Sequence, residues 1–353
     1  MHTQSKALSV LVPVIAVLLA FMIGGVIIAA VGASPIASVG YLVQGAFGNR
    51  TNIGATLVKA TPLIFTGLCA CFAYRCGVFN LGGEGQFIAG SVAAIWVVTS
   101  WGIEGPGAVV IALLLGTIAG AVWGAIPGLL RITRGLNEMI VSIMLNYVAT
   151  LFMGWTYTEL LRDGSVPQTF PVPDASRIGR LFEGMRATWG LVIALLLAFG
   201  IYYFLFYTSW GFRLRAVGLN MTAARYQGFA IKRYILMSFI VSGAIAGLGG
   251  AIELLGTQFR LMSGYALGFG FDGVAIALIA QLNPLATVLV AYFFAVLRTG
   301  ATTMQVGSGV PTSVIDIIQA LVIVFAVAGT ALMRLPGIKQ FVLTHFDKEK
   351  KEV

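Results

Sequence analysis

The stretch Ser209–Tyr234 reads SWGFRLRAVGLNMTAARYQGFAIKRY and separates two long apolar segments of the chain. Its basic side chains are Arg213, Arg215, Arg225, Lys232 and Arg233. Because a loop with fixed positive charge is hard to move across a bilayer, this stretch is predicted to lie in the cytoplasm. Its centre, Met221–Gly228, has the composition of a helix too short to be stable alone. Such a segment favours docking by a second protein, which indicates a transporter whose motor is a separate subunit.

The composition places most of the chain in lipid. Of its 353 residues, 58% are hydrophobic and 10% are charged, compared with about 25% charged in soluble domains. The formal net charge is +9, but the basic residues fall in separate short loops. A nucleic-acid-binding protein would gather them on one face with aromatic residues between them. The charge pattern therefore indicates membrane topology, and a nucleic-acid partner is not expected.

Ten apolar segments approach the roughly 20 residues that a helix needs to cross a bilayer. They lie near 8–32, 56–74, 83–101, 107–130, 138–161, 187–208, 234–255, 268–282, 285–302 and 313–333. The alternating strands of about 10 residues that a membrane barrel needs are missing from the sequence. We therefore predict an all-α polytopic integral membrane protein of about ten transmembrane helices, with some of them broken or short.

The chain is predicted to be a single transmembrane domain, residues 1–353, and the balance of charge predicts its topology. With the N-terminus inside, the cytoplasmic loops carry more arginine and lysine than the opposite side, so both termini are predicted to be cytoplasmic. The segment 209–233 then becomes a cytoplasmic loop and 335–353 a cytoplasmic tail. The segment 162–186, which contains three prolines and mixed charge, becomes the main external loop.

The order of turn-forming and acidic residues is consistent with an inverted repeat. Gly105-Pro106, Pro127 and Glu138 follow one another in the first half, and Asn283-Pro284, Pro311 and Asp316 follow in the same order in the second. Transporter repeats often run in opposite senses, as these two halves do in the predicted topology.

Polar residues within the apolar region are candidates for a substrate path. The segment FNLGGEGQ places Asn80, Glu84 and Gln86 among three glycines that loosen a helix. Because a carboxylate is costly near the bilayer core, it usually faces a cavity or a partner. Two interpretations of Glu84 remain open: a broken helix that contributes to a polar passage, or a short cytoplasmic turn with Glu84 at a helix N-terminus.

Two further candidates lie in other spans. Asn146 is two turns into its predicted helix, where an amide needs a hydrogen bond across helices or a water-filled path. Asp272 belongs to Gly268-Phe-Gly-Phe-Asp-Gly273, a literal G-x-G-x-x-G without the strand that nucleotide binding requires. We interpret these glycines as helix breakers or close-packing positions. Glu159 and Glu253, near outer span ends, are explained as solvated.

No catalytic or metal site is predicted. The only histidines, His2 and His345, are near the ends of the sequence, and no P-loop motif is present. The three cysteines, Cys69, Cys71 and Cys76, fall in an apolar stretch, where packing explains them better than metal or redox chemistry. We therefore expect neither an enzyme nor a bound cofactor.

A series of short motifs between about Leu57 and Ile323 resembles the permease subunits of bacterial ABC importers for nucleosides and simple sugars. In order they are Ala60-Thr-Pro-Leu63 with Thr66-Gly-Leu68, Phe79–Gln86, Leu136-Asn-Glu-Met139 with Met144-Leu-Asn-Tyr147, Gly218-Leu-Asn220 with Ala223-Ala-Arg-Tyr226 and Gly228, Ser242-Gly-Ala-Ile-Ala-Gly-Leu248, Gly268–Gly273 and Asn283-Pro284. Each motif is weak alone, and their shared order makes the resemblance specific.

The resemblance implies a multi-pass subunit of the bacterial cytoplasmic membrane that imports nucleosides, with simple sugars as the broader class. It implies three partners: a cytoplasmic ABC ATPase that binds the ATP, a second and related permease that completes a heterodimer, and an extracytoplasmic substrate-binding lipoprotein. The loop 209–233 is similar to the family's ATPase-coupling loop. The matching positions are Arg215, Gly218, Asn220, Ala223, Ala224, Arg225 and Gly228.

Other functions remain as alternatives. An ion-coupled secondary transporter of a small polar solute would use Glu84, Glu138 or Asp272 as its proton or sodium site, but it leaves the basic loop without a role. A passive channel shares the same spans. A membrane enzyme would need a nucleophile, metal set or acid–base pair that the sequence does not offer.

Overall fold

The computed structural model describes residues 2–266 and 268–332, and this part of the chain is almost entirely helical, with isolated β-bridges and no strand. Its α-helices are α1 (His2–Ala30), α2 (Pro35–Phe47), α3 (Arg50–Arg75), α4 (Gly83–Ser100), α5 (Pro106–Arg134), α6 (Glu138–Trp155), α7 (Trp189–Tyr207), α8 (Ser209–Leu219), α9 (Met221–Tyr226), α10 (Ile231–Glu253), α11 (Phe269–Ile279), α12 (Pro284–Ser308) and α13 (Ser313–Leu332). Short π-helical turns, η1 (Thr156–Leu160) and η3 (Leu254–Gln258), follow α6 and α10, and a 3₁₀ turn, η2 (Asp174–Ser176), lies in the predicted external loop. The predicted tail 335–353 lies outside the described residues.

Each of the ten predicted apolar segments contains a helix, so the all-α membrane fold is confirmed. The predicted count of about ten spans is not. Six helices in the described residues are long and apolar enough to cross a bilayer: α3, α5, α6 with η1, α7, α10 with η3, and α12. The pair α1 and α2, bent by 114°, would make a seventh, while α11 and α13 are shorter apolar helices. The cytoplasmic location of the termini stays a prediction.

The described residues form two compact units: Ala46–Val296, and a second unit built from the chain before Ala46 and after Val296. In the second unit α1 packs along α13, where Gly24 lies directly against Ile318. The positions discussed below all belong to the central unit, Ala46–Val296.

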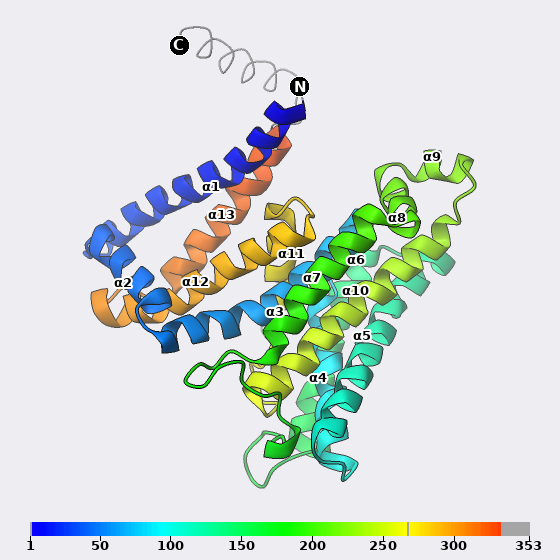
Figure 1. Cartoon of the computed structure of the whole chain (residues 1–353), viewed down its shortest axis with the longest axis horizontal. Helices are drawn as coiled ribbons and strands as arrows, with labels where there is room; N and C mark the ends of the chain where they lie inside the picture. The colour runs from blue at the N-terminus through cyan, green and yellow to red at the C-terminus, as the bar shows by residue number, and fades with distance from the viewer. Residues whose placement is uncertain (1, 267, 333–353) are drawn as a thin grey trace. The chain divides into compact units, whose positions relative to one another are not determined.

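Close helix contacts in the central unit depend on glycine. Helices α4, α5 and α10 lie side by side (Figure 1). A Cβ atom on Gly120 of α5 would overlap the backbone of Gly243 and Gly247 of α10, which leaves space only for hydrogen. Because lipid provides little hydrophobic force between helices, this close backbone packing carries much of their association. Gly243 and Gly247 are therefore the positions of α10 that allow α5 to approach closely.

Candidate functional site

The chain returns into the helix bundle between α3 and α4. After Cys76 it runs without helical structure to Gly82, and the side chain of Asn80 reaches Ser242, near the middle of α10. Non-helical backbone at this depth is tolerated only where protein or water satisfies its polar groups. The segment is thus largely buried within the helix bundle, and Glu84 lies in the first turn of a helix, α4, as one of the two interpretations expected. The side of the membrane from which the segment enters stays a prediction.

Asn80 and Gln86 form a reciprocal amide pair at this depth. Asn80 Nδ2 donates to Gln86 Oε1 (3.0 Å) and to Ser242 Oγ (2.8 Å), and Gln86 Nε2 donates back to Asn80 Oδ1 (3.0 Å). The same Oδ1 accepts from Gly82 N (2.9 Å). Both amides are fully buried, so these bonds fix the irregular segment and the start of α4 against α10.

Asn146 binds the same irregular segment and the start of α4 from α6. Its Oδ1 accepts from Gly85 N (2.8 Å), and its Nδ2 donates to the carbonyl of Leu81 (2.9 Å). Asn146 lies in the middle of α6, so α4 begins near mid-depth of both α6 and α10. Of the two environments considered for this amide, the structure shows the hydrogen bond across helices. Asn80, Gln86 and Asn146 together form the amide lock of the segment that precedes α4.

The N-termini of α4 and α11 meet at Glu84. Its Oε2 accepts from Gly268 N (3.2 Å), the residue before α11, and Gly270 lies against the backbone of Glu84 so closely that a Cβ would overlap it. Asp272 is in the first turn of α11 and close enough to Glu84 to interact electrostatically. With 11 residues at 1.5 Å each, α11 reaches only about half the thickness of a bilayer.

The segments α3–α4 and α10–α11 therefore have the same arrangement of secondary structure. In each, a long helix is followed by a non-helical return and then by a helix with an acidic residue in its first turn. The positive ends of two helix dipoles converge where these helices begin. Such meeting points of broken helices are common binding positions in transporters. All five predicted path residues are thus grouped around one junction, although their contact with a solute stays a prediction.

Glu253 departs from its expected environment. Glu159 is exposed, as predicted, but only 4% of Glu253 is exposed, so the solvated explanation is wrong for this residue. Its cover comes from the external loop, where Val172 N donates to Phe259 O (2.8 Å) and Ile178 N donates to Leu255 O (2.9 Å). An ion pair between Arg260 and Asp163 (2.8 Å) ties the same two segments together.

The basic segment forms two helices, α8 and α9, in which the predicted short helix is present. Asn220 separates them and caps α9, because its Oδ1 accepts from Ala223 N (3.0 Å). Ala224 is buried, whereas Arg225 and the glycine that follows α9, Gly228, are exposed. Two large apolar side chains, Leu219 (88% exposed) and Tyr226 (89% exposed), project from this polar segment. Sequence reasoning did not single them out as contacts, although apolar residues in an extramembrane loop were the available signal.

Gly218 joins this segment to the base of α3. A Cβ at this position would overlap the carbonyl of Arg75, and a Cβ on Gly77 would lie only 3.1 Å from the Gly218 backbone. Arg75 Nε in turn donates to Leu282 O (2.7 Å), in the turn that follows α11. Arg215 does not face outward, because its guanidinium lies 4.9 Å from the centre of the Phe206 ring. The basic segment is thus in direct contact with the chain that leads, within three residues, to the amide lock.

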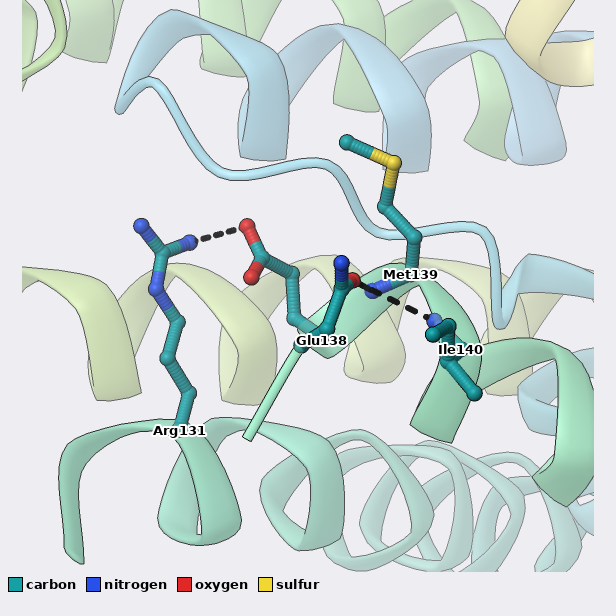
Figure 2. Close-up of polar contacts among 5 residues, drawn as sticks. Arg131, Glu138, Met139 and Ile140 are labelled. Carbon is teal, nitrogen blue, oxygen red and sulfur yellow. Dashed lines mark hydrogen bonds and ion pairs between the residues drawn. The ribbon is translucent and has the colours of Figure 1, made fainter. Parts of the chain in front are cut away.

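A second polar contact fixes the start of α6. Figure 2 shows Arg131 of α5 directed at Glu138, with a distance of 2.5 Å between Nη1 and Oε1. Asn137 caps the helix by accepting from the N–H groups of Met139 (2.9 Å) and Ile140 (3.4 Å). Glu138 therefore lies in the first turn of α6, where its charge favours the helix dipole, and it also pairs with the cation of Arg131.

The three cysteines are buried and form no disulfide. Cys69 packs beside the amide lock, with its Sγ 3.6 Å from Gln86 Oε1, and Cys71 belongs to a hydrophobic cluster with Ala70 and Ala277. Within the described residues, no group of three or more His, Cys, Asp or Glu side chains is arranged to hold a metal ion. The packing interpretation accounts for the environment of all three.

Comparison with known proteins identifies a family over most of the chain. Residues 52–327 match the family described as "Branched-chain amino acid transport system / permease component". The guanosine ABC transporter permease protein NupP of Bacillus subtilis is 36% identical over 93% of this chain and 95% of its own length. The nucleoside ABC transporter permease protein NupB of Lactococcus lactis is 33% identical over 99% of each chain. The glucose ABC transporter permease protein TsgB13 of Haloferax volcanii is 32% identical over 91% of this chain and 88% of its own.

A more distant match is NupQ, a second guanosine ABC transporter permease protein of Bacillus subtilis, which is 28% identical over 69% of this chain and 79% of its own length. No solved structure matches the chain.

Proposed function

Because this chain belongs to the branched-chain amino acid transport system / permease component family, we propose that it is the membrane subunit of an ATP-driven importer for nucleosides. The importer resides in the bacterial cytoplasmic membrane, and its energy comes from a separate ABC ATPase that binds the ATP. The chain itself carries no ATPase site. Support for the cargo comes from two relatives of 36% and 33% identity, which are named for guanosine and for nucleosides.

The contact between Gly218 and the Arg75–Gly77 backbone is the observation that carries the mechanism. The ATPase docks on α8 and α9, where Leu219, Tyr226 and Arg225 are exposed. When the ATPase dimer closes, the movement of α8 passes through this contact to the non-helical return before α4. The junction of α4 and α11 then opens alternately to the two sides of the membrane.

The cargo path runs past the junction of α4 and α11. Glu84 and Asp272 are the two acidic groups there, and the converging helix N-termini offer N–H donors to polar groups of the solute. Asn80, Gln86 and Asn146 maintain the junction through the amide lock, since their polar groups are bonded within the protein. We assign the direct cargo contacts to Glu84 and Asp272, and a positioning role to the three amides.

Two further partners complete the proposed importer. The match to both NupP and NupQ of one organism favours a heterodimer with a second permease. An extracytoplasmic substrate-binding lipoprotein delivers the cargo to the external loop, which backbone hydrogen bonds attach to residues 255–261.

Uptake of labelled guanosine and adenosine in cells with and without this chain tests the proposal. We expect uptake to need the chain, to continue when the ion gradients are collapsed, and to stop when ATP is depleted. Uptake that stops with the ion gradients while ATP remains would favour the ion-coupled secondary transporter instead. If glucose competed with nucleoside uptake, the cargo would instead be a simple sugar. Simple sugars are the second candidate because of the similarity to TsgB13.

A further inference from the structure

Glu253 is a buried acidic group for which the proposed mechanism has no role. Its Oε1 accepts from Gln258 Nε2 (3.2 Å), and Thr257 lies beside the same carboxyl group. Its Oε2 is buried and has no hydrogen-bond partner among the described residues. By contrast, each amide of the lock is bonded through both its oxygen and its nitrogen. A buried carboxyl oxygen without a partner is costly, so its retention needs a reason.

The hydroxyl group of Tyr265, near Glu253, is hydrogen-bonded to other groups. Tyr265, which comes from the non-helical return before α11, is close enough to Glu253 for the two groups to interact electrostatically. Its hydroxyl donates to the carbonyl of Gly250 (3.1 Å) and lies 3.0 Å from Ser91 Oγ. Tyr265 therefore lies near Glu253, but the hydroxyl proton of Tyr265 is donated to Gly250 O rather than to the carboxyl group.

The backbone after Glu253 is irregular in the way that functional sites often are. Helix α10 changes at this residue to the π-helical turn η3, a form that is rare and recurs at functional sites. The turn ends at Phe259, whose φ of 58° lies in the left-handed region that a bulky residue rarely adopts. The external loop covers this turn, because Ile178 donates to the carbonyl of Leu255 within it and Val172 donates to the carbonyl of Phe259 at its end.

We propose that Glu253 is a cargo-binding residue, and that its Oε2 accepts a hydrogen bond from a hydroxyl group of the solute as it enters beneath the external loop. The inference rests on the proposed function for the class of cargo. Hydroxyl groups are the donors that nucleosides and simple sugars share, and a carboxylate is among the strongest acceptors for them. A site built to bond a hydroxyl group discriminates strongly against an analogue that lacks it.

The test combines one substitution with a series of substrate analogues in the assembled importer. Glu253→Met removes the acceptor and keeps a side chain of similar length that suits a buried site. Uptake of adenosine is compared with uptake of its 2′-deoxy, 3′-deoxy and 5′-deoxy analogues. We expect Glu253→Met to lower adenosine uptake at low concentration about tenfold, and to have no effect on the analogue that lacks the contacted hydroxyl group.

The control is Glu159→Met, because Glu159 also belongs to a π-helical turn at a helix end but is exposed. Its uptake of all four compounds should equal that of the unaltered protein, while Glu253→Gln should recover part of the adenosine uptake. An equal fall for all four compounds in Glu253→Met, or no fall for any, would overturn the assignment while leaving the importer proposal intact.

A second measurement decides the assignment even if the importer takes up no nucleoside. Glu253→Cys is treated from outside with a small, water-soluble methanethiosulfonate during ATP turnover. Modification supports a position on the solute route, and protection throughout turnover overturns it. The unaltered protein is the negative control, since all three native cysteines are buried, and Glu159→Cys is the positive control.

Discussion

Asn80 is the residue on which the irregular segment before α4 depends most. It bonds at once to Gln86, to Ser242 and to the backbone of Gly82, and no part of it is exposed. An amide can donate and accept in two directions, so one side chain satisfies groups from three parts of the chain. Replacement by an apolar residue would remove these bonds and leave the N–H of Gly82 and the amide nitrogen of Gln86 without the acceptor that Asn80 provides.

Asn80→Ala should therefore lower the free energy of unfolding by at least about 1–3 kcal/mol, the cost of one unpaired buried polar group. Thermal unfolding of the purified protein in detergent measures this as a lower Tm. Gln227→Ala, which removes an exposed amide, should leave the Tm unchanged. Equal Tm values for Asn80→Ala and the unaltered protein would mean that the amide lock does not stabilise this state.

The sequence indicated which buried polar residues are structurally important, but it did not indicate their hydrogen-bond partners. Asn80, Gln86 and Asn146 were noticeable because amides are costly in lipid, but their partners lie far away in the chain, such as Ser242 for Asn80. Glu253 was misread for the same reason. Its cover comes from 172–178, a segment nearly 80 residues earlier, and nothing near Glu253 in the sequence reveals it.

At the scale of elements, hydropathy located a helix in each of the ten predicted segments, but it missed α2 and did not give the depth of any helix. A short apolar segment such as 269–279 has the same composition whether it crosses the bilayer or starts halfway through it. The difference comes from tertiary contacts, here the bond from Gly268 N to Glu84 and the bond from Arg75 to Leu282. The number of full crossings could not be predicted from composition for this reason.

The contact of α8 with the end of α3 makes a direct prediction about coupling. Gly218→Ala places a Cβ against the carbonyl of Arg75, so α8 must shift away from α3. The exposed face of α9 is unaltered, so the ATPase should still bind and hydrolyse ATP. We expect the ratio of solute transported to ATP hydrolysed to fall several-fold in reconstituted vesicles that contain the complete importer.

The matched control for this experiment is Gly200→Ala on α7, where the added Cβ meets no atom within 4 Å. Alanine is also the better helix former by about 1 kcal/mol, so this variant should transport normally. If Gly218→Ala and Gly200→Ala gave the same ratio, movement would not pass through the contact between Gly218 and Arg75.

Helices α5 and α10 make a prediction about packing. Gly120→Ala forces a methyl group into the backbone of α10 at Gly243 and Gly247, and overpacking of this kind costs about 1–3 kcal/mol. The Tm should fall accordingly. Gly107→Ala, in the first turn of the same helix, meets open space and serves as the control. A Gly120→Ala variant as stable as Gly107→Ala would show that the two helices separate easily to admit the methyl group.

At the scale of the central unit, α7 and α10 connect the two regions to which the proposed function assigns partners. Each has α8 or α9 near one end and the external loop near the other (Figure 1). The basic residues gather at the first end, which the positive-inside rule assigns to the cytoplasm. In the proposed mechanism the same pair of helices links the ATPase to the side on which the cargo arrives.

This arrangement predicts opposite labelling of two exposed positions. Ser165→Cys, in the external loop, should react with a membrane-impermeant maleimide in intact cells, whereas Thr222→Cys, on α9, should react only after the membrane is permeabilised. The native cysteines are buried and give a low background, which the unaltered protein measures. Labelling of Thr222→Cys from outside would show that the predicted topology is inverted. Helices α8 and α9 would then lie out of reach of a cytoplasmic ATPase.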